Sequence, residues 1–388
     1  MIARELAKII LPFTKQLPVS VITGPRQSGK TTLVKAIFPE YDYINLEFPD
    51  TREHVINDPR LFLSTHENGI VIDEVQRVPE LFSYIQGIVD ETGRNGRFIL
   101  TGSQNFLLLE QISQTLAGRA ALFHLLPFSI TEIASGFPVA DHFVQYAFTG
   151  TYPRIYDQQL QPYDWYPWYI SSYIERDVRQ IENVKDLNKF QTFLKMCAGR
   201  VGQLFNASAI ANDIGVNYKT IQSWISILEA SFIVFLLSPF HKNYNKRLTK
   251  SPKIYFYDTG LICSLLGIRS SNELNFHYLK GEIFESLIIS EMKKFLVNTN
   301  SQANLYFWRD STGHEIDCIV ETGSKVTAIE IKSSTTINPD FFKGLHYWQN
   351  LTGYPADNSV LVYGGAENQQ WSKGQVLSWK NTNIIFDL

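Results

Sequence analysis

The stretch Gly24–Thr32 combines two glycines, a lysine and hydroxyl side chains at a spacing that could hold a phosphate. It follows the apolar run Val19–Ile22 and leads into Leu33–Ala36. Glycines let a loop turn so that successive backbone N–H groups point at an anion, and a following helix adds the positive end of its dipole. Lys30 would then reach the β- and γ-phosphates of a nucleotide, and the Thr31 hydroxyl would ligate the accompanying Mg²⁺. The residues predicted to bind ATP are Gly24, Pro25, Arg26, Gln27, Ser28, Gly29, Lys30, Thr31 and Thr32.

A second apolar strand, Gly69–Ile72, ends in two carboxylates, Asp73 and Glu74. A buried parallel strand that ends at a nucleotide site has this pattern. Asp73 would hold the Mg²⁺, mostly through water, and Glu74 would polarise the water that attacks the γ-phosphate. We therefore expect ATP hydrolysis, with Lys30 and Glu74 among the catalytic residues.

A third apolar strand, Phe98–Thr101, is followed by small polar residues. It resembles the sensor strand of AAA-type ATPases. The resemblance implies that Ser103 hydrogen-bonds near the γ-phosphate or the attacking water, with Thr101 or Gln104 in its place if the register differs.

Arg119 follows Leu116-Ala117-Gly118 and precedes another apolar strand. In the same superfamily an arginine at this place often lies at a subunit interface and stabilises charge on a neighbour's nucleotide. That catalytic role requires a homo-oligomer, and the alternative is a surface arginine at a helix end. Weaker candidates for the role are Arg26, Arg154 and Arg176.

Length and composition indicate a globular protein of two or three domains. The chain has 388 residues, of which 44% are hydrophobic and 19% charged, and its net charge is −3. This charge gives no general affinity for nucleic acid, so any such contact must come from local patches.

Cys197, Cys263 and Cys318 lack the spacing of a disulfide framework or a zinc site. The N-terminus has no signal-peptide pattern, and the apolar run Ala230–Leu237 is too short to span a membrane, so we expect a cytoplasmic protein without a membrane partner.

Apolar strands alternate with helical stretches over residues 1–140, which predicts an α/β domain with a parallel sheet and a ligand at the carboxyl edge of the strands. The remaining predicted parts are a helical lid or linker over 141–200, a winged-helix module over 201–270 and a second α/β domain over 271–388. The strands predicted for the first domain are Val19–Ile22, Tyr43–Leu46, Ile70–Ile72, Phe98–Thr101 and Ala121–Leu125.

The stretch Ala207–Ile221 matches a helix-turn-helix, with Gly215 supplying the turn. Ile233–Leu237 and Ile254–Tyr257 would form the hairpin of a winged helix. DNA is one partner that this module could contact, and the alternative is a lid or a protein contact. The side chains that could face a DNA groove are Asn217, Tyr218, Lys219, Thr220 and Gln222, and those that would make the hairpin region positive are Lys242, Lys246, Arg247, Lys250 and Lys253.

Charged residues interrupt the apolar strands of the C-terminal region. Because strand side chains alternate, Glu330 and Lys332 share one face, and Asp317 on an adjacent strand can approach them. The two carboxylates would bind Mg²⁺, Glu285 could complete the metal site, and Lys332 would act on a hydrolytic water. This arrangement resembles the PD-(D/E)xK nucleases, which implies a restriction-endonuclease-like fold. The alternative is a salt-bridged sheet that keeps the fold without cleavage.

The order of these parts resembles a prokaryotic family of AAA-type ATP-binding proteins with a C-terminal domain of the DUF4143 type. The resemblance implies an ATPase core, a winged-helix module and a nuclease-like C-terminal domain, and it does not identify a substrate. Our hypothesis is a Mg²⁺-dependent ATPase of the AAA class that is coupled to a nucleic-acid-directed C-terminal domain through the winged helix. The alternative is a nucleotide-dependent switch or adaptor whose C-terminal domain binds a protein partner without cleavage. The matching stretches are the phosphate loop, Ile72–Glu74, Leu100–Ser103, Leu116–Arg119, Tyr152-Pro153, Glu175–Asp177, Tyr257–Leu261 and Gly313–Asp317.

Overall fold

The structure, a computed structural model, describes residues 2–102, 114–138, 140–174, 186–241 and 250–387. The chain forms two compact units. The first comprises residues up to 128 together with the short segments 230–232 and 297–300, and the second comprises the remainder. Among the helices of the described residues, none is long and apolar enough to cross a membrane.

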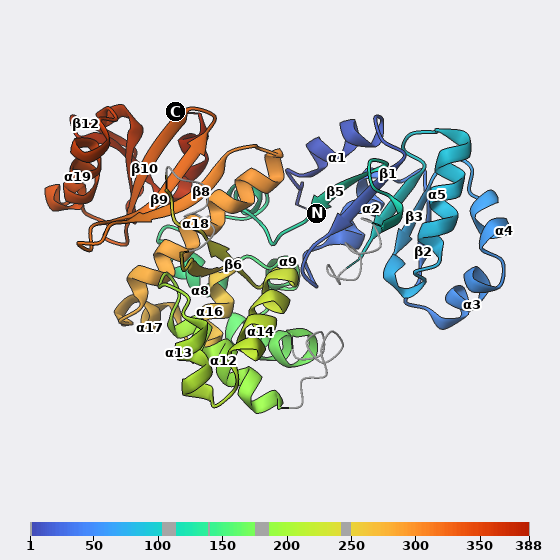
Figure 1. Cartoon of the computed structure of the whole chain (residues 1–388), viewed down its shortest axis with the longest axis horizontal. Coiled ribbons are helices and arrows are strands. Elements are labelled where there is room, and N and C mark those ends of the chain that lie inside the picture. The colour runs from blue at the N-terminus through green and yellow to red at the C-terminus, as the bar shows by residue number, and fades with distance from the viewer. Residues whose placement is uncertain (1, 103–113, 139, 175–185, 242–249, 388) are drawn as a thin grey trace. The chain divides into compact units, whose positions relative to one another are not determined.

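The first unit is built on a five-stranded sheet in the order β2-β3-β4-β1-β5, and all of its strand pairs are parallel (Figure 1). Strands β1, β3 and β4 are buried along their whole length, which explains their nearly continuous apolar sequences. The predicted parallel α/β domain is therefore confirmed. The strands are β1 (Val19–Thr23), β2 (Asp42–Asn45), β3 (Ile70–Asp73), β4 (Phe98–Thr101) and β5 (Ala120–His124).

Helices cover both faces of this sheet because alternate strand residues point to opposite sides. Val21 and Leu100 pack with the side chains of α3, α4 and α5, whereas Ile22 and Ile99 pack with those of α1 and α2. The helices are α1 (Ala7–Thr14), α2 (Lys30–Ile37), α3 (Pro49–Asn57), α4 (Pro59–Ser64) and α5 (Leu81–Thr92), with a 3₁₀ turn η1 (Val75–Arg77) after β3.

The first part of the second unit is mainly helical. Helices α13 and α14 are joined at Gly215, whose φ of 72° provides the left-handed turn expected between them. Strands β6 and β7 pair antiparallel with Phe235 opposite Tyr255, as the hairpin prediction required, while the winged-helix assignment stays a prediction. The elements are α7 (Ile130–Ala134), α8 (Phe143–Thr149), α9 (Pro153–Asp157), α10 (Pro162–Tyr169), the π-helix η2 (Ile170–Ile174), α12 (Leu187–Gly199), α13 (Ala207–Ile214), α14 (Tyr218–Ala230), β6 (Val234–Leu237), β7 (Lys253–Phe256), α16 (Thr259–Leu265) and α17 (Ser271–Phe276).

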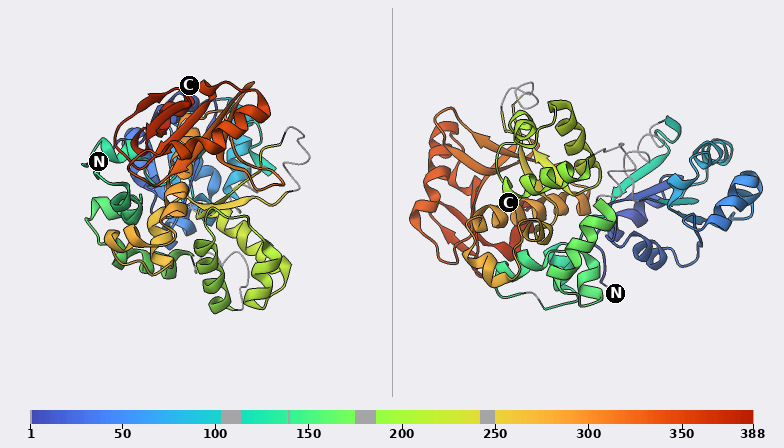
Figure 2. Two further views of the ribbon diagram at one scale, coloured as in Figure 1. Left: turned by 90° about the vertical axis from the view of Figure 1, so that its left-hand side faces the viewer. Right: turned by 90° about the horizontal axis from the view of Figure 1, so that it is seen from below.

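The C-terminal part of the second unit contains a six-stranded mixed sheet in the order β12-β13-β11-β10-β9-β8. Its strands are among the orange and red arrows of Figures 1 and 2. Leu345 and Trp348 of α19 pack on one face of this sheet against Ile316 and Ala328. The elements are α18 (Lys280–Thr299), β8 (Asn304–Arg309), β9 (Glu315–Thr322), β10 (Lys325–Lys332), η3 (Pro339–Phe342), α19 (Lys343–Thr352), η4 (Ala356–Asn358), β11 (Ser359–Tyr363), β12 (Gln369–Trp371), β13 (Gly374–Ser378) and η5 (Trp379–Phe386).

Strand β9 contains a bulge next to its acidic residue. Tyr306 pairs with Ile319 and Trp308 with Ile316, so β9 advances three residues while β8 advances two. The segment between these pairs includes Asp317. Bulges redirect side chains and bend strands, and this one lies where the sequence predicts a functional carboxylate.

Candidate functional site

The loop between β1 and α2 has the backbone that a phosphate loop needs. Gly24 and Gly29 have φ angles of 148° and 92°, and Gln27 is left-handed at 65°. A Cβ atom on Gly24 would lie 2.2 Å from the carbonyl oxygen of Leu125, so only glycine fits there. The two glycines therefore allow the turn of the loop, and Gly24 also allows the backbone to lie close to Leu125, the residue after β5.

Lys30 is the first residue of α2, and its side chain folds back over the loop. The residue is only 7% exposed. Its Nζ donates hydrogen bonds to the carbonyl oxygens of Gly24 at 3.0 Å and Pro25 at 2.9 Å. A positive charge is thus held within the loop at the N-terminus of the helix, where an anion is favoured.

Asp73, at the carboxyl end of β3, accepts hydrogen bonds from three hydroxyl groups. Its Oδ2 accepts from Thr31 Oγ1 at 2.8 Å and from the Tyr43 hydroxyl at 2.5 Å, and its Oδ1 accepts from Thr101. Burial, together with the hydrogen bond to Asp73, raises the pKa of Tyr43 and keeps its phenol protonated as a donor. The structure therefore places the two predicted Mg²⁺ ligands, Thr31 and Asp73, in direct contact.

Two of these partners go beyond what the sequence predicts. Tyr43 reaches Asp73 from β2, beside β3, and no sequence pattern indicates this contact. Thr101 is predicted only as a substitute for Ser103, yet it binds Asp73 directly. Ser103 and Gln104 lie outside the described residues, so the role of Ser103 stays a prediction.

Glu74 directly follows Asp73 in a left-handed backbone conformation, with φ 58° and ψ 43°. This conformation costs a non-glycine residue about 1–2 kcal/mol, and such strain often occurs at functional sites. The side chain of Gln76 donates to Glu74 Oε2 at 2.6 Å, a contact that the sequence analysis missed. Glu74 thus lies at the edge of the sheet where β3 ends, with its carboxylate held by Gln76.

Arg4 supports the phosphate loop from outside, which the sequence analysis did not anticipate. Its guanidinium donates to the carbonyl oxygens of Ser28 at 2.7 Å and Leu126 at 2.6 Å, and it lies over the ring of Phe128. In a trans peptide the C=O of one residue and the N–H of the next point in opposite directions. Because Arg4 binds the Ser28 carbonyl, the N–H of Gly29 in the same peptide points away from Arg4.

Replacing Arg4 with methionine should weaken ATP binding by about tenfold, because the loop then loses the hydrogen bonds that orient its peptides (about 1.4 kcal/mol). Arg4→Lys should restore only part of the affinity, since an ammonium lacks the planar fork that reaches two carbonyls. Calorimetric titration with MgATP measures both effects. Arg60→Met, at an exposed arginine of α4, is the control, and equal affinities for Arg4→Met and this control would contradict the prediction.

Arg119 is not brought to the phosphate loop of its own chain. It precedes β5 and pairs with Asp90 through two contacts of 2.5 and 3.0 Å. The loop lies at the opposite, carboxyl edge, and the five residues of β5 span about 16 Å between the two edges. Its role at a neighbour's nucleotide stays a prediction, as do those of Arg26 and Arg154, while Arg176 lies outside the described residues.

In the second unit, the structure brings together the predicted residues of β9 and β10. Lys332 Nζ lies 3.2 Å from Asp317 Oδ2 and 2.6 Å from Glu330 Oε2, and the backbone N–H of Ile331 donates to Asp317 at 2.8 Å. Glu330 also lies against α19, where a Cβ atom on Gly344 would be 2.3 Å from Glu330 Oε1. Burial, and then the charge of Asp317, raise the pKa of Glu330 to about 8 despite the nearby ammonium.

Glu285, the third predicted metal ligand, contacts other residues of the protein. Its Oε1 accepts hydrogen bonds from the Tyr255 hydroxyl at 2.5 Å and from Lys253 Nζ at 3.2 Å. Within the described ranges, no three His, Cys, Asp or Glu side chains are gathered as a metal site. Metal binding by Asp317, Glu330 and Glu285 stays a prediction.

The prediction for Lys253 is wrong, because this lysine adds no positive charge to the surface of the hairpin. It is 4% exposed and forms ion pairs with Glu285 and Glu315. Lys250 is exposed. Lys242, Lys246 and Arg247 lie outside the described residues.

The candidate DNA-facing residues are partly engaged within the protein. Asn217 accepts from the backbone N–H of Thr220 at 2.8 Å and so acts as the cap of α14. Gln222 donates to the Tyr218 hydroxyl at 2.6 Å. DNA contact by these residues and by Lys219 stays a prediction.

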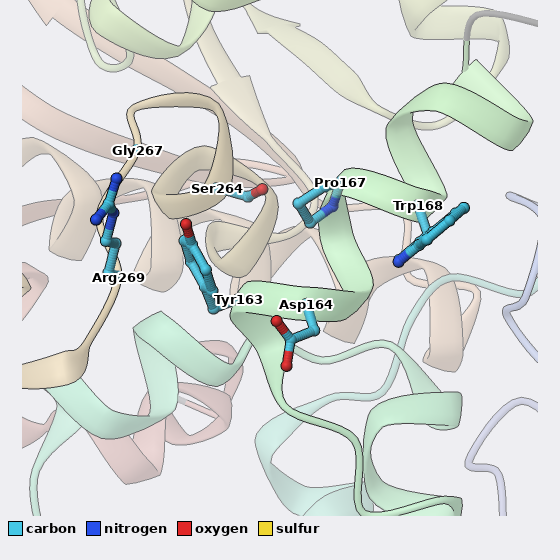
Figure 3. Close-up of a pocket in the computed structure, with 7 residues that line it drawn as sticks. All are labelled: Tyr163, Asp164, Pro167, Trp168, Ser264, Gly267 and Arg269. Atoms are coloured by element: carbon cyan, nitrogen blue, oxygen red, sulfur yellow. The ribbon is translucent and has the colours of Figure 1, made fainter.

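A separate cavity of about 380 Å³ lies between α10 and the C-terminal end of α16 with the residues that follow it (Figure 3). At the edge of the cavity, the guanidinium carbon of Arg269 lies 5.8 Å from the centre of the Tyr163 ring. No residue predicted for catalysis or for nucleotide or metal binding lines this cavity. Its lining residues are Tyr163, Asp164, Pro167, Trp168, Ser264, Gly267 and Arg269.

The parallel sheet, the loop after β1 and the acidic end of β3 define an α/β protein with a P-loop ATPase-like domain. Comparison with protein families agrees: an AAA domain matches residues 16–134, the domain of unknown function DUF8612 matches 140–272, and the domain of unknown function DUF4143 matches 280–382. The chain is 31% identical over 338 residues to the uncharacterized protein Rv2008c of Mycobacterium tuberculosis, covering 86% of this chain and 74% of the relative. It therefore belongs to the family of proteins that join an N-terminal AAA domain to a C-terminal DUF4143 domain.

More distant relatives are also uncharacterized. The protein MJ1544 of Methanocaldococcus jannaschii is 22% identical over 340 residues, covering 78% of this chain and 72% of the relative. Among solved structures, a variant of Thermotoga maritima RuvB aligns with 63% of this chain and 92% of its own, at 15% identity and a TM-score of 0.30. Similarity at that level carries no functional assignment.

Proposed function

We propose that this chain is a Mg²⁺-dependent ATPase that uses the loop Gly24–Thr31 and the carboxylates of Asp73 and Glu74. The observation that carries the proposal is the contact of 2.8 Å between Thr31 and Asp73, beside a loop that already holds the ammonium of Lys30. A hydroxyl and a carboxylate side by side are oxygen ligands of the kind that Mg²⁺ takes in nucleotide sites.

Each residue has a role that follows from its position. The loop amides and Lys30 bind the phosphates, and Arg4 keeps the loop oriented through the Ser28 carbonyl. Thr31 and Asp73 would hold Mg²⁺, which neutralises phosphate charge during transfer. Glu74 accepts a proton from the attacking water or orients that water, and Gln76 fixes its carboxylate.

Titration of the purified chain with ATP in magnesium buffer tests this proposal. We expect a saturable heat of binding and a steady release of inorganic phosphate. Removal of divalent ions with EDTA should stop phosphate release, because Thr31 and Asp73 would then lack the ion that they hold. The absence of any binding heat with either ATP or GTP would refute the proposal.

For the C-terminal half, one observation favours the nucleotide-dependent switch over the nuclease. Glu285, which the nuclease prediction assigns to the metal, is bound by Lys253 and Tyr255. A nuclease of the predicted kind needs a divalent ion at Asp317, whereas a switch that docks on a protein does not. Binding of Mn²⁺ that depends on Asp317 therefore separates these two functions.

A further inference from the structure

The second unit contains a group of four carboxylates and two ammonium groups, which we call the acidic cluster. Each of its two lysines forms ion pairs with two of the carboxylates. The cluster comprises Glu285, Glu315, Asp317, Glu330, Lys253 and Lys332. Lys332 joins Asp317 to Glu330, and both of its partners lie on β9 and β10. Lys253 comes from β7, outside this sheet.

Lys253 reaches the cluster from a different part of the fold. It is the first residue of β7, the strand that pairs with β6, and its backbone also forms a bridge with Leu204. Its two acidic partners come from α18 and β9. One side chain thus connects the β6–β7 hairpin to both a helix and a strand of the C-terminal part.

Lys253 is buried between two acidic side chains. Its side chain is 5% exposed, and its Nζ lies 3.2 Å from Glu285 Oε1 and in ion-pair contact with Glu315. Glu285 is itself only 15% exposed. A carboxylate buried in this way requires a cation nearby, because an unpaired charge is very unfavourable away from water.

Neighbouring side chains contact Lys253 and its acidic partners. Tyr255, two residues along the same strand, donates its hydroxyl to the same Glu285 oxygen. The ring centre of Phe307 is 5.6 Å from Lys253 Nζ. On the outer side, Arg309 Nε lies 3.7 Å from Glu315 Oε2. Glu285 therefore has Lys253 and Tyr255 as donors, and Glu315 lies between Lys253 and Arg309.

We propose that the ammonium of Lys253 is the resident cation of this acidic cluster, in place of a divalent metal ion. It ties the β6–β7 hairpin to α18 and β9 and keeps the cluster closed. The C-terminal domain is then metal-free in its resting form. This conclusion does not depend on ATP binding by the first unit.

Titration with Mn²⁺ in the absence of nucleotide, followed by electron paramagnetic resonance, tests the metal-free state. The wild-type protein and Asp317→Asn should bind the same number of Mn²⁺ ions with the same affinity. A Mn²⁺ ion that is lost in the variant Asp73→Asn is assigned to the phosphate-loop site of the first unit. A Mn²⁺ ion that the wild type binds and Asp317→Asn loses would overturn the proposal.

The tethering role is tested with Lys253→Met, which keeps most of the length of the side chain and removes its charge. The melting temperature should fall by about 10 °C, since breaking a buried ion pair leaves an uncompensated charge. Lys250→Met, at an exposed lysine just before the same strand, should melt like the wild type. A melting temperature of Lys253→Met equal to that of this control would overturn the proposal. If Lys253→Met does not fold at all, the loss of stability is in the expected direction and larger than about 10 °C.

A gain of metal binding gives an independent readout. In Lys253→Met, Glu285 and Glu315 lack their cation, so Mn²⁺ should bind at least about tenfold more tightly than to the wild type. Adding Glu315→Gln to Lys253→Met should remove that gain. If folded Lys253→Met showed the Mn²⁺ affinity of the wild type, Lys253 would not be what excludes the metal.

Discussion

The Lys30→Ala variant is expected to bind ATP at least about 100-fold more weakly than the wild-type protein, a loss of about 3 kcal/mol. Lys30 is 7% exposed as a residue and its ammonium lies against the loop carbonyls, so its hydrogen bonds to phosphate would be little screened by water. The substitution also removes the two bonds to Gly24 and Pro25 that hold the loop. Calorimetry with MgATP gives the affinity, and phosphate release should fall with it.

The control for this experiment is Lys8→Ala, at an exposed lysine of α1 in the same unit. Melting curves of both variants separate loss of binding from loss of fold. An affinity of Lys30→Ala close to that of Lys8→Ala would show that the loop does not hold phosphate, and the ATPase proposal would then fail.

The Glu74→Gln variant should bind ATP almost normally but hydrolyse it at least about 100-fold more slowly, the usual contribution of a general base. Glutamine keeps the size of the side chain and can still hydrogen-bond Gln76, yet it cannot accept a proton from water. Because Thr31, Asp73 and Lys30 are untouched, the affinity should remain. Single-turnover hydrolysis and calorimetry on the same sample measure the two quantities separately.

Glu80→Gln provides a matched control, because Glu80 is an exposed glutamate at the start of α5. Its turnover should equal that of the wild type. If Glu74→Gln lost affinity and turnover to the same extent, the carboxylate would act in binding. If neither changed, another group would have to activate the water.

Much of the nucleotide site could be predicted from the sequence because its parts are local. The glycines, Lys30 and Thr31 lie within one turn and the start of one helix, where spacing alone fixes which groups share a face. Asp73 and Glu74 were placed by the same reasoning, since an apolar strand that ends in carboxylates delivers them to one edge of a parallel sheet.

Contacts between distant residues were harder to predict. Tyr43 reaches Asp73 because β2 pairs with β3, and Thr101 reaches it because β4 lies on the other side of β3. Arg119 was placed correctly before a strand, but the direction of that strand puts it at the edge away from the loop. Strand order and direction are properties of the whole sheet, which side-chain periodicity within one strand does not encode.

By itself, the sequence of this chain determined the strand, loop and helix that form the phosphate loop, the acidic end of β3 and the Glu330–Lys332 pattern, because each depends on the spacing of near neighbours. Only the tertiary structure decided that Arg4 supports the loop through Ser28 and that Lys253 is buried between Glu285 and Glu315. A lysine next to a turn has the same local pattern whether it faces water or a carboxylate. What distinguishes the two cases is the position of a helix and a strand more than thirty residues away, and that position is set by the packing of the complete unit.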